Sequence, residues 1–388
     1  MLKQSSPEMA VLIQYADPTI QTVNGNQLAD IDTASVQWDR VFDLGVDHGV
    51  LPLLSRFVGG LEGIAPEAFI ERLNEHNHAV AARNLMFART LSEVSHHLES
   101  AGISMLGFKG PALEAAVYPT DTIRDYGDLD VLVPQTDLVS AVTALTDIGF
   151  APASGLPPPT AGMYGGIVRP PMLEEYTLFR DDIKLEVRWR IGDSDRPFKP
   201  LFDDLWRRRR SVSVDGATIP VLHPVDRLQM LAFHGTKHRW HQLKWVSDFS
   251  AAVATIDRSW PEILEASTSN GNLRRVVLAV GLRASLFGYP LPRSVSDILE
   301  NDHRLHSVID STAELIIRGD NSRPTSTQRL GYTLATSDSW HDRLRALIMC
   351  RPLHPSVPEY RLLPLPGRLF GVYYAVRPMR ILLKLLTG

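Results

Sequence analysis

Two aspartates, Asp128 and Asp130, stand two residues apart and open the short apolar stretch 131–133. The apolar stretch predicts a β-strand, in which alternate side chains point to the same face of the sheet. The two carboxylates would then lie side by side, where they repel each other unless a cation lies between them. Mg²⁺ prefers oxygen ligands of this kind and shares its other positions with water and phosphates. The pair therefore predicts a site for Mg²⁺ or the similar ion Mn²⁺.

A third carboxylate, Glu186, lies on the polar side of a later predicted strand, 183–189. Apolar and polar residues alternate along this strand with a period of two. If the strand lies beside the first one, Glu186 completes a triad that could hold two metal ions. Such ions polarise a phosphoryl oxygen, activate an attacking hydroxyl and stabilise a pyrophosphate leaving group. The alternative is that all three acidic side chains are ordinary surface charges.

A turn with two glycines and a lysine, Gly107-Phe-Lys109-Gly110, precedes the acidic strand, and Pro111 then opens a short helix. Backbone N–H groups at a helix start and a nearby lysine form an anion site, suited to the β- and γ-phosphates of a nucleotide. Glycine there lets the backbone approach a ligand closely. Arg124, on the loop before Asp128, is a second candidate for phosphate contact; the alternative is a solvated loop arginine.

Histidines and charged residues follow Pro224 in a stretch that is helix-like up to Ile256. His234 and His238 would share one helix face, with His241 one turn further. Zinc is one interpretation, but there is no third ligand at a defined spacing, so hydrogen bonding or the lining of a polar cleft is favoured. The candidates for contact with a substrate in this stretch are His234, Lys237, His238, Lys244 and Asp248.

These residues together resemble a known family. The pattern Phe108-Lys-Gly-Pro-Ala-Leu113, Tyr118-Pro119, Arg124 and Asp128-Leu-Asp-Val-Leu-Val133 is similar to the uncharacterised nucleotidyltransferase family of the DNA polymerase β-like superfamily. The likeness extends to Glu186-Val-Arg-Trp189, His234-Gly-Thr-Lys-His238 and Leu243-Lys-Trp-Val-Ser-Asp248. It covers roughly residues 35–255 and, more loosely, the tail.

The resemblance implies a small mixed sheet flanked by helices and a glycine-containing turn that holds a triphosphate. It also implies that Asp128 and Asp130 are the paired metal ligands and Glu186 the third carboxylate. The turn departs from the superfamily, which usually has a Gly-Ser pair, so its phosphate contact would run through the ammonium group of Lys109. A second departure is Arg188, which stands where family members often have histidine and is a candidate for the acceptor side.

The elements that must position these residues are predicted from periodicity. Helical patterns over 34–57 and 68–100 lead to a strand at 103–108, and a short helix and the acidic strand follow. Two hairpins, 174–189 and 211–222, extend the sheet, and the second is expected to close it. We therefore predict an α+β fold, with a small mixed β-sheet core flanked by N-terminal and C-terminal helical regions. The expected domains are 1–85, 86–222 and 223–388.

Several segments are expected to lie outside this core. Residues 1–32 predict a loosely ordered lead-in, 151–172 a long Pro/Gly-rich loop and 320–328 an exposed linker. The tail 363–386 predicts an amphipathic helix interrupted at Pro378, and we expect it to dock on the helical domain rather than on a membrane. The basic run 207–210 is expected to be a solvated edge rather than a contact with nucleic acid.

The composition of the chain excludes several classes of protein. The chain has 388 residues, 44% hydrophobic and 22% charged, as in ordinary globular proteins. Its formal charge of −4, from 40 basic and 44 acidic residues, gives no global field that attracts nucleic acid. The single cysteine, Cys350, excludes an internal disulfide and a cysteine-rich zinc site. We find no secretory signal and no apolar run long enough to span a bilayer, so we expect a cytoplasmic protein.

The function that we predict is Mg²⁺-dependent nucleotidyl transfer. An acceptor hydroxyl attacks the α-phosphate of an NTP and pyrophosphate leaves, while the acidic triad holds the metal and Gly107, Lys109, Gly110 and Arg124 hold the triphosphate. The acceptor could be a small molecule, a sugar, a protein side chain or a tRNA. One alternative is a metal-dependent glycosyltransferase that uses a nucleotide sugar, which would need neither the Lys109-Gly110 turn nor Glu186. The other alternative is a non-catalytic module that binds a nucleotide or a partner.

Overall fold

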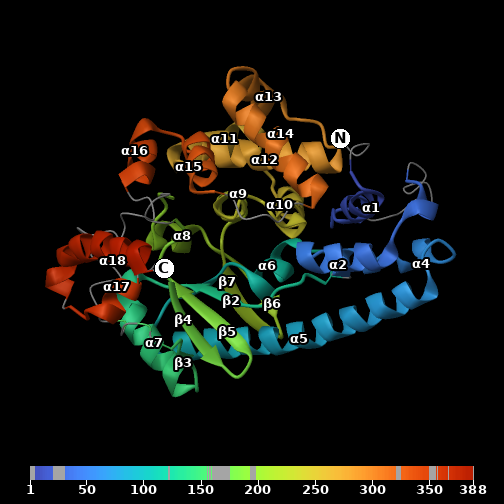
Figure 1. Cartoon of the computed structure of the whole chain (residues 1–388). Coiled ribbons are helices and arrows are strands. Elements are labelled where there is room, and N and C mark those ends of the chain that lie inside the picture. The colour runs from blue at the N-terminus through green and yellow to red at the C-terminus, as the bar shows by residue number, and fades with distance from the viewer. Residues whose placement is uncertain are drawn as a thin grey trace.

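A computed structural model of the chain describes residues 5–20, 31–120, 123–154, 156, 159, 175–192, 198–319, 325–348, 355, 357–365 and 367–387. Most of the predicted loop 151–172 and of the predicted linker 320–328 lies outside these ranges. Helices at both ends of the chain surround a central sheet (Figure 1), which confirms the predicted α+β class. Among the described residues, no helix is both long and apolar enough to cross a membrane.

The sheet is mixed and has seven strands. Its strands are β1 (Leu106–Gly107), β2 (Leu129–Leu132), β3 (Ala151–Pro152), β4 (Glu175–Arg180), β5 (Ile183–Arg188), β6 (Arg210–Val214) and β7 (Ala217–Val221). They lie in the order β3-β4-β5-β2-β1-β7-β6. The pairs β2–β5 and β1–β7 are parallel and the others are antiparallel. The predicted second hairpin, now β6–β7, does close the sheet at one edge.

The helices before and between the strands are α1 (Pro7–Tyr15), α2 (Trp38–His48), α3 (Leu51–Ser55), α4 (Val58–Leu61), α5 (Glu67–Ser100), α6 (Gly110–Val117), α7 (Leu138–Asp147) and α8 (Phe202–Arg208). The later helices are α9 (Pro224–Lys237), α10 (Leu243–Ala254), α11 (Trp260–Ser269), α12 (Leu273–Phe287), α13 (Arg293–Glu300), α14 (His303–Arg318), α15 (Ser326–Ala335), α16 (Trp340–Ile348), α17 (Val357–Leu362) and α18 (Tyr373–Thr387). Short 3₁₀ turns lie at Thr33–Ser35, Gln135–Asp137 and Gly367–Val372.

The two faces of the sheet belong to different hydrophobic cores. Leu129 and Val131 of β2 and Leu185 and Val187 of β5 pack into one core with α5 and α7. Leu132 belongs instead to the second core, which contains residues of the N-terminal and C-terminal helices. Because side chains alternate along a strand, residues 128, 130, 184, 186 and 188 lie on this second side. The polar residues of both strands therefore face the same way.

Two observations bear on the predicted domain boundaries. Helix α5 runs from Glu67 to Ser100 and crosses the expected boundary at residue 85 without a break. The second core joins residues of α1 and α2 to residues of α9, α10, α12 and α14. The N-terminal and C-terminal helices are therefore packed as one body around that core.

The prediction of a loosely ordered lead-in over residues 1–32 is wrong for its described part. Helix α1 is capped by the Ser6 side chain and is buried on almost every side. Leu12 and Ile13, for example, are 1% and 2% exposed. A helix that is buried all round has no polar face and so shows little amphipathic periodicity in its sequence.

The predicted continuous helix up to Ile256 is also wrong, because the chain turns between α9 and α10. Arg239 and Trp240 have φ values of 56° and 53°, in the left-handed region. The Trp240 side chain is fully buried and packs on α9, where a Cβ at Gly235 would lie 2.6 Å from its ring. His241 is consequently in the connection and not on the helix face of His234.

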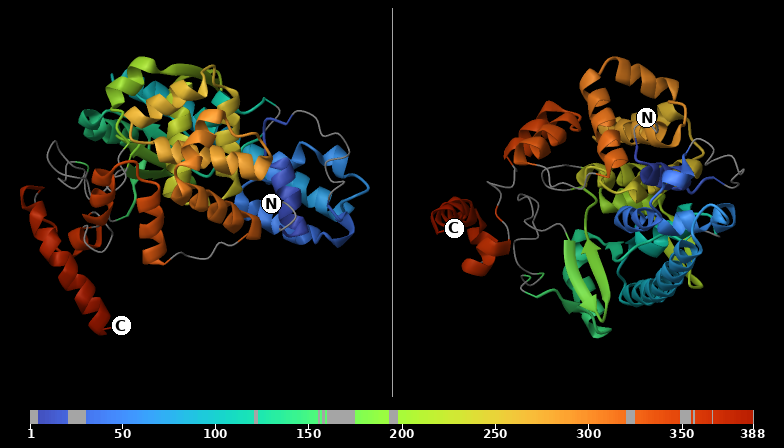
Figure 2. Two further views of the ribbon diagram at one scale, coloured as in Figure 1. Left: turned by 90° about the horizontal axis from the view of Figure 1, so that it is seen from above. Right: turned by 45° about the vertical axis from the view of Figure 1, so that its right-hand side comes forward.

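The tail departs from its prediction in two ways. Helix α18 continues through Pro378, which removes one hydrogen bond of the helix without ending it. Its main neighbours are α17 and the turn Gly367–Val372, and it stands at the edge of the molecule in both views of Figure 2. Met379, Leu382 and Leu383 are exposed, so this helix does not dock on the helical domain through them.

Candidate active site

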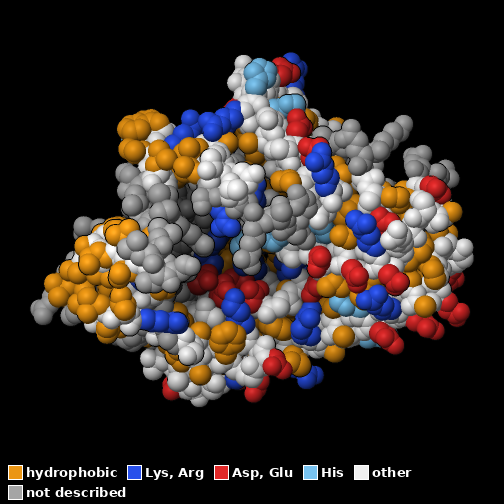
Figure 3. Space-filling view, in the orientation of Figure 1, with side chains coloured by type: hydrophobic (Ala, Val, Ile, Leu, Met, Phe, Trp, Pro, Cys, Tyr) orange, Lys and Arg blue, Asp and Glu red, His pale blue; other side chains and the backbone are white. Residues whose placement is uncertain are grey.

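The parallel pairing of β2 with β5 brings the three predicted carboxylates together. Asp130 is the register partner of Glu186, and Asp128 directly precedes β2. One ligand oxygen from each of the three residues lies within 4.8 Å of the others, so the three carboxylates are close enough to share a cation. Figure 3 shows acidic side chains gathered in a hollow over these strands, next to basic ones. The predicted proximity of the triad is therefore present.

Burial and the neighbouring charges together give Asp130 and Glu186 different pKa values. Asp130 is 1% exposed, and burial raises its pKa to about 7; Lys109 opposes this effect, and the neighbouring Asp128 and Glu186 add to it. Burial also acts to raise the pKa of Glu186, but the hydrogen bond from Lys184 and the charge of Lys109 outweigh it and leave that pKa below its usual value.

Basic side chains surround the triad. Lys109 Nζ lies 2.8 Å from Asp130 Oδ2. Lys184 Nζ contacts Glu186 Oε1 and lies 3.8 Å from Asp128 Oδ2. The sequence analysis did not single out Lys184, although its position two residues before Glu186 on an alternating strand places both on one face.

Arg188, predicted to lie on the acceptor side, continues the polar face of β5. Its NH1 lies 2.6 Å from Glu175 Oε2 and 3.9 Å from Glu186 Oε2. The side chain is buried, since only 8% of it is exposed. Arg188 therefore borders the acidic cluster and is held by an acid on the neighbouring strand β4.

The three carboxylates fit a divalent cation. Asp130 Oδ1 is buried and has no hydrogen-bond partner among the described residues, so its chemistry fits a bound cation. The donor set consists of hard oxygen atoms, which suit Mg²⁺ or Mn²⁺. Two oxygens bound to one Mg²⁺ are at most about 4.2 Å apart, which is close to the 4.8 Å within which these ligand oxygens lie.

The glycine–lysine turn joins the acidic strand through its backbone. Gly110, the first residue of α6, has φ +56°, and a Cβ there would lie 3.1 Å from the carbonyl oxygen of Asp128. Glycine is favoured at this position by both the left-handed backbone and the close approach. Glycine is favoured at position 107 for a different reason, because a Cβ there would lie 2.8 Å from the Cβ of Ala112. Gly107 therefore allows α6 to pack closely on β1.

Arg124, predicted to contact phosphate, binds a protein carboxylate. Its Nε donates to Asp248 Oδ1 at 2.6 Å, and its NH2 donates to Asp248 Oδ2 at 2.8 Å. The Tyr118 hydroxyl donates to the same Asp248 Oδ1 at 2.7 Å. All three side chains are buried. Arg124 is thus not a solvated loop arginine, and Asp248, expected to face a substrate, is enclosed by these partners.

Further contacts fix the loop that leads to Asp128. Glu114 on α6 accepts hydrogen bonds from the Arg124 backbone N–H at 2.8 Å and from the Tyr126 hydroxyl at 3.0 Å. The amide of Asn84 on α5 donates to the Arg124 carbonyl at 2.8 Å. The pairing of these residues depends on contacts distant in sequence, and the sequence analysis missed them. Helices α5, α6 and α10 together position Asp128.

The histidines lie beside the site but do not form a metal site of their own. His234 and His238 have ring centroids 4.7 Å apart, and the His234 ring is 5.6 Å from that of Trp245. Burial, followed by the charge of Lys109, holds the pKa of His234 well below its usual value. Within the described part of the chain, the acidic triad is the only cluster of three potential metal ligands. The zinc interpretation is not supported there.

Two lysines predicted to contact a substrate lie at the ends of the adjoining helices. Lys237 is the last residue of α9 and is partly buried. Lys244, in the first turn of α10, packs over Gly49, where a Cβ would lie 2.5 Å from the lysine Cδ. Burial and the charge of Arg124 lower the pKa of Lys244, although nearby acids including Asp128 oppose them. Lys244 is therefore within electrostatic reach of the triad.

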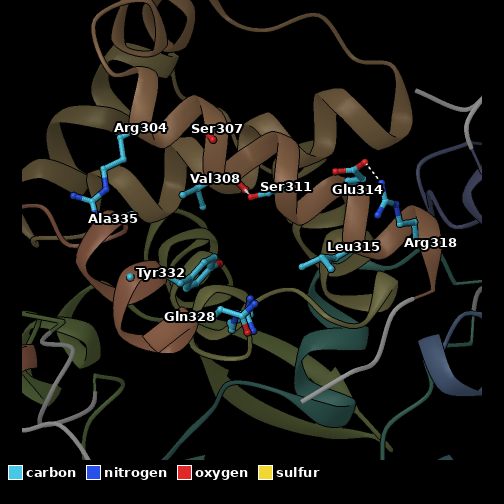
Figure 4. A pocket seen from close by; sticks show the side chains of 12 residues that line it. Arg304, Ser307, Val308, Ser311, Glu314, Leu315, Arg318, Gln328, Tyr332 and Ala335 are labelled. Atoms are coloured by element: carbon cyan, nitrogen blue, oxygen red, sulfur yellow. Dashed lines mark hydrogen bonds and ion pairs between the residues drawn. The ribbon is translucent and has the colours of Figure 1, made fainter. Parts of the chain in front are cut away.

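A separate cavity of about 580 Å³ lies between α14 and α15 (Figure 4). Arg304 and Arg318 of α14 and Tyr332 of α15 contribute to its lining. None of the predicted site residues lines it. The cavity is thus distinct from the acidic cluster, and nothing in its lining reproduces the chemistry of that cluster.

Comparison with known protein families gives a match. The model of a family described as uncharacterised nucleotidyltransferases matches residues 34–288, well over half of the chain. No curated protein matches the sequence. The matched range includes the acidic triad, the glycine–lysine turn and both helices of the histidine segment.

Proposed function

The chain belongs to the uncharacterised nucleotidyltransferase family, and we propose that it transfers a nucleoside monophosphate from an NTP to a hydroxyl acceptor with release of pyrophosphate. The observation that supports this reaction most directly is the convergence of Asp128, Asp130 and Glu186, with ligand oxygens within 4.8 Å of one another. Membership makes the protein a transferase of phosphorus-containing groups. The Mg²⁺ dependence and the hydroxyl acceptor are the proposed parts.

Asp128, Asp130 and Glu186 would hold Mg²⁺ or Mn²⁺ in this proposal. The bound metal would neutralise charge on the phosphates and increase the acidity of the attacking hydroxyl. The unpartnered Oδ1 of Asp130 supports this role, because a buried carboxylate oxygen without a hydrogen bond needs a cation or a donor. Glu186 being part of the cluster favours nucleotidyl transfer over the glycosyltransferase alternative, which would not need it.

Bond changes in the proposed step are simple. The acceptor oxygen forms a bond to the α-phosphorus, the bond from that phosphorus to the oxygen bridging to the β-phosphate breaks, and pyrophosphate leaves. The hydroxyl proton passes to a carboxylate oxygen or to water. Most of the acceleration would come from positioning and charge neutralisation, as is usual in phosphoryl transfer.

The glycine–lysine turn would hold the triphosphate. Lys109 lies at the start of α6, where its ammonium group and the free backbone N–H groups of the first turn can meet an anion. Gly110 brings this turn against the backbone of Asp128, so the anion site and the metal site adjoin. Gly107 allows this arrangement by close packing, and Arg124 supports it from the loop. Lys244, His234 and Arg188 remain candidates for the acceptor side.

Pyrophosphate release tests the proposal. Purified protein is incubated with Mg²⁺, each of the four NTPs labelled at the α-phosphate and a cell extract as the source of acceptor, and labelled products and pyrophosphate are measured. We expect Asp130→Asn to keep its fold and to lose at least about a thousandfold in rate, since it removes a buried metal ligand. Retention of wild-type activity by Asp130→Asn would contradict the assignment.

The matched control is Asp182→Asn, which changes an exposed aspartate in the β4–β5 turn only four residues before Glu186. This variant should keep wild-type activity.

Calorimetry with Mg-NTP tests the remaining alternative, a non-catalytic module. Such a module would bind the nucleotide without forming product in any acceptor fraction.

A further inference from the structure

Lys184 occupies the space between two of the three carboxylates. It lies on β5 two residues before Glu186, so both side chains rise from the same face of the sheet. Its Nζ contacts Glu186 Oε1 and is 3.8 Å from Asp128 Oδ2. The ammonium group therefore lies where a cation shared by these two carboxylates would lie.

The second lysine of the site is held differently. Lys109 Nζ is 2.8 Å from Asp130 Oδ2, and its side chain is 12% exposed at the start of α6. The Lys184 side chain is 36% exposed and lies near the start of β5, directly after a turn whose residues Asp181 and Asp182 are exposed. Lys184 therefore has a path into solvent, whereas Lys109 is enclosed beside the most buried acid.

Three carboxylates this close to one another cannot remain uncompensated. Unit charges of the same sign at about 4 Å repel strongly in a partly buried environment, so a nearby positive charge stabilises the ionised carboxylates. Lys184 provides it from within the chain, but an ammonium group cannot reproduce the several directed oxygen bonds that a divalent cation makes to the same carboxylates.

We propose that Lys184 is a built-in counter-ion of the metal-free site, which a divalent cation displaces when it binds to the three carboxylates. This inference rests on the proposed function, because it assumes that the triad is a metal site. It adds a residue that sets the metal affinity: the cation must compete with the lysine before it reaches Glu186 and Asp128. Lys109, being enclosed, keeps its place beside Asp130.

Metal binding without nucleotide tests this idea directly. Titration of Mn²⁺ into the metal-free protein is followed by calorimetry for the wild type, Lys184→Met and Lys184→Arg. We expect Lys184→Met to bind Mn²⁺ about tenfold more tightly, because the competing charge is gone, and Lys184→Arg to bind as the wild type does. The thermal midpoint of the metal-free Lys184→Met protein should fall, and its rise on addition of Mn²⁺ should exceed that of the wild type.

The charge control is Arg210→Met, which removes an exposed basic residue from β6 at the far edge of the same sheet. This variant should bind Mn²⁺ as the wild type does. Lys184→Gln is a second variant of similar length, so the comparison does not depend on the stability of one substitution. Unchanged or weaker Mn²⁺ binding by both Lys184→Met and Lys184→Gln would overturn the inference.

Failure of the proposed function gives a different result in the same titration. Asp130→Asn should abolish Mn²⁺ binding if the triad is the site. If the wild type binds no Mn²⁺, or if Asp130→Asn binds it equally well, the metal site itself is wrong. If Asp130→Asn abolishes binding but removal of Lys184 has no effect, the metal site stands and the counter-ion role is wrong.

Discussion

Arg124 and Asp248 form a buried, bidentate ion pair that connects the loop before Asp128 to α10. The two side chains are 7% and 1% exposed. A charge left without its partner at such a site cannot be hydrated, which makes the loss of one partner costly. The pair thus couples the position of Asp128, a proposed metal ligand, to the C-terminal helices.

Asp248→Asn tests this coupling. The substitution keeps the shape but removes the charge that compensates Arg124, and we expect the free energy of unfolding to fall by about 3 kcal/mol or more. Urea denaturation followed by circular dichroism measures this change. Mn²⁺ binding should also weaken, since the loop that carries Asp128 loses its anchor.

The exposed pair of Arg207 and Asp204 supplies the control. Asp204→Asn should leave the urea midpoint unchanged, because exposed ion pairs add little to stability. If Asp248→Asn unfolds at the wild-type urea concentration and binds Mn²⁺ normally, the pair neither stabilises the chain nor positions the site.

Which site residues the sequence could predict depends on how local their signals are. Asp128 and Asp130 were found because a period of two places them on one face, and Glu186 because the same period marks the polar side of its strand. Lys184 follows from the same alternation and could have been included. The partnership of Arg124 with Asp248 joins residues far apart in the chain, and no local pattern reports such a contact.

At the scale of elements, the end of α2 packs against the start of α10, next to Lys244. His48, at the end of α2, is 1% exposed, and its Nδ1 accepts a hydrogen bond from the Leu243 backbone N–H at 3.2 Å. Burial lowers the pKa of His48 to about 4, with smaller opposing and supporting effects of Asp47 and His241. Only the neutral imidazole is compatible with this junction, because a proton on Nδ1 would face the donor.

The pKa of His48 predicts how stability depends on pH. The folded-state pKa of His48 lies below the ordinary 6.5. The neutral His48 side chain therefore makes its full contribution to the free energy of unfolding above pH 6.5, and this contribution is lost as the pH falls towards 4. The shift corresponds to about 3 kcal/mol. We expect His48→Asn, whose amide oxygen can take the place of Nδ1, to show a smaller loss of unfolding free energy between pH 7 and pH 4.

Urea unfolding at several pH values measures the difference between the two proteins, which cancels the other titrating groups. His303→Asn, a change of an exposed histidine at the start of α14, is the control and should follow the wild type. Parallel stability curves for the wild type and His48→Asn would argue against a buried neutral histidine at this junction.

The bounds of a helix could be predicted from the sequence where one face of the helix is polar. Helix α5 begins and ends close to its predicted position because its apolar residues recur every three or four residues. Helix α1 lacks a polar face and was missed for that reason. The turn after α9 was missed because it depends on the packing of Trp240 against Gly235, a contact that helical periodicity does not reveal.

On the scale of the whole molecule, the cores distinguish the two ends of the chain. The core that joins N-terminal and C-terminal helices includes α1, whereas among the described residues no buried member of either core lies beyond Ile317, and Tyr332 only packs against the first of them. The ends of the chain are therefore unequal: α1 is internal, and α17 and α18 pack chiefly with each other and with the turn between them.

Truncation from either end should then have opposite results. A chain without residues 1–20 loses five side chains of α1 that are 2% exposed or less: Met9, Val11, Leu12, Ile13 and Tyr15. At about 1.5–3 kcal/mol for each buried side chain, this loss is comparable with the roughly 5–15 kcal/mol that stabilises a typical domain. We expect that protein to be unfolded or insoluble.

A chain that ends at residue 348 should keep its thermal midpoint within about 2 °C of the wild type and bind Mn²⁺ equally well, because the sheet and both cores remain intact. Differential scanning calorimetry and the Mn²⁺ titration measure both. Loss of metal binding in the shorter chain would mean that the tail contributes to the site, and a folded, stable chain without residues 1–20 would mean that the core closes without α1.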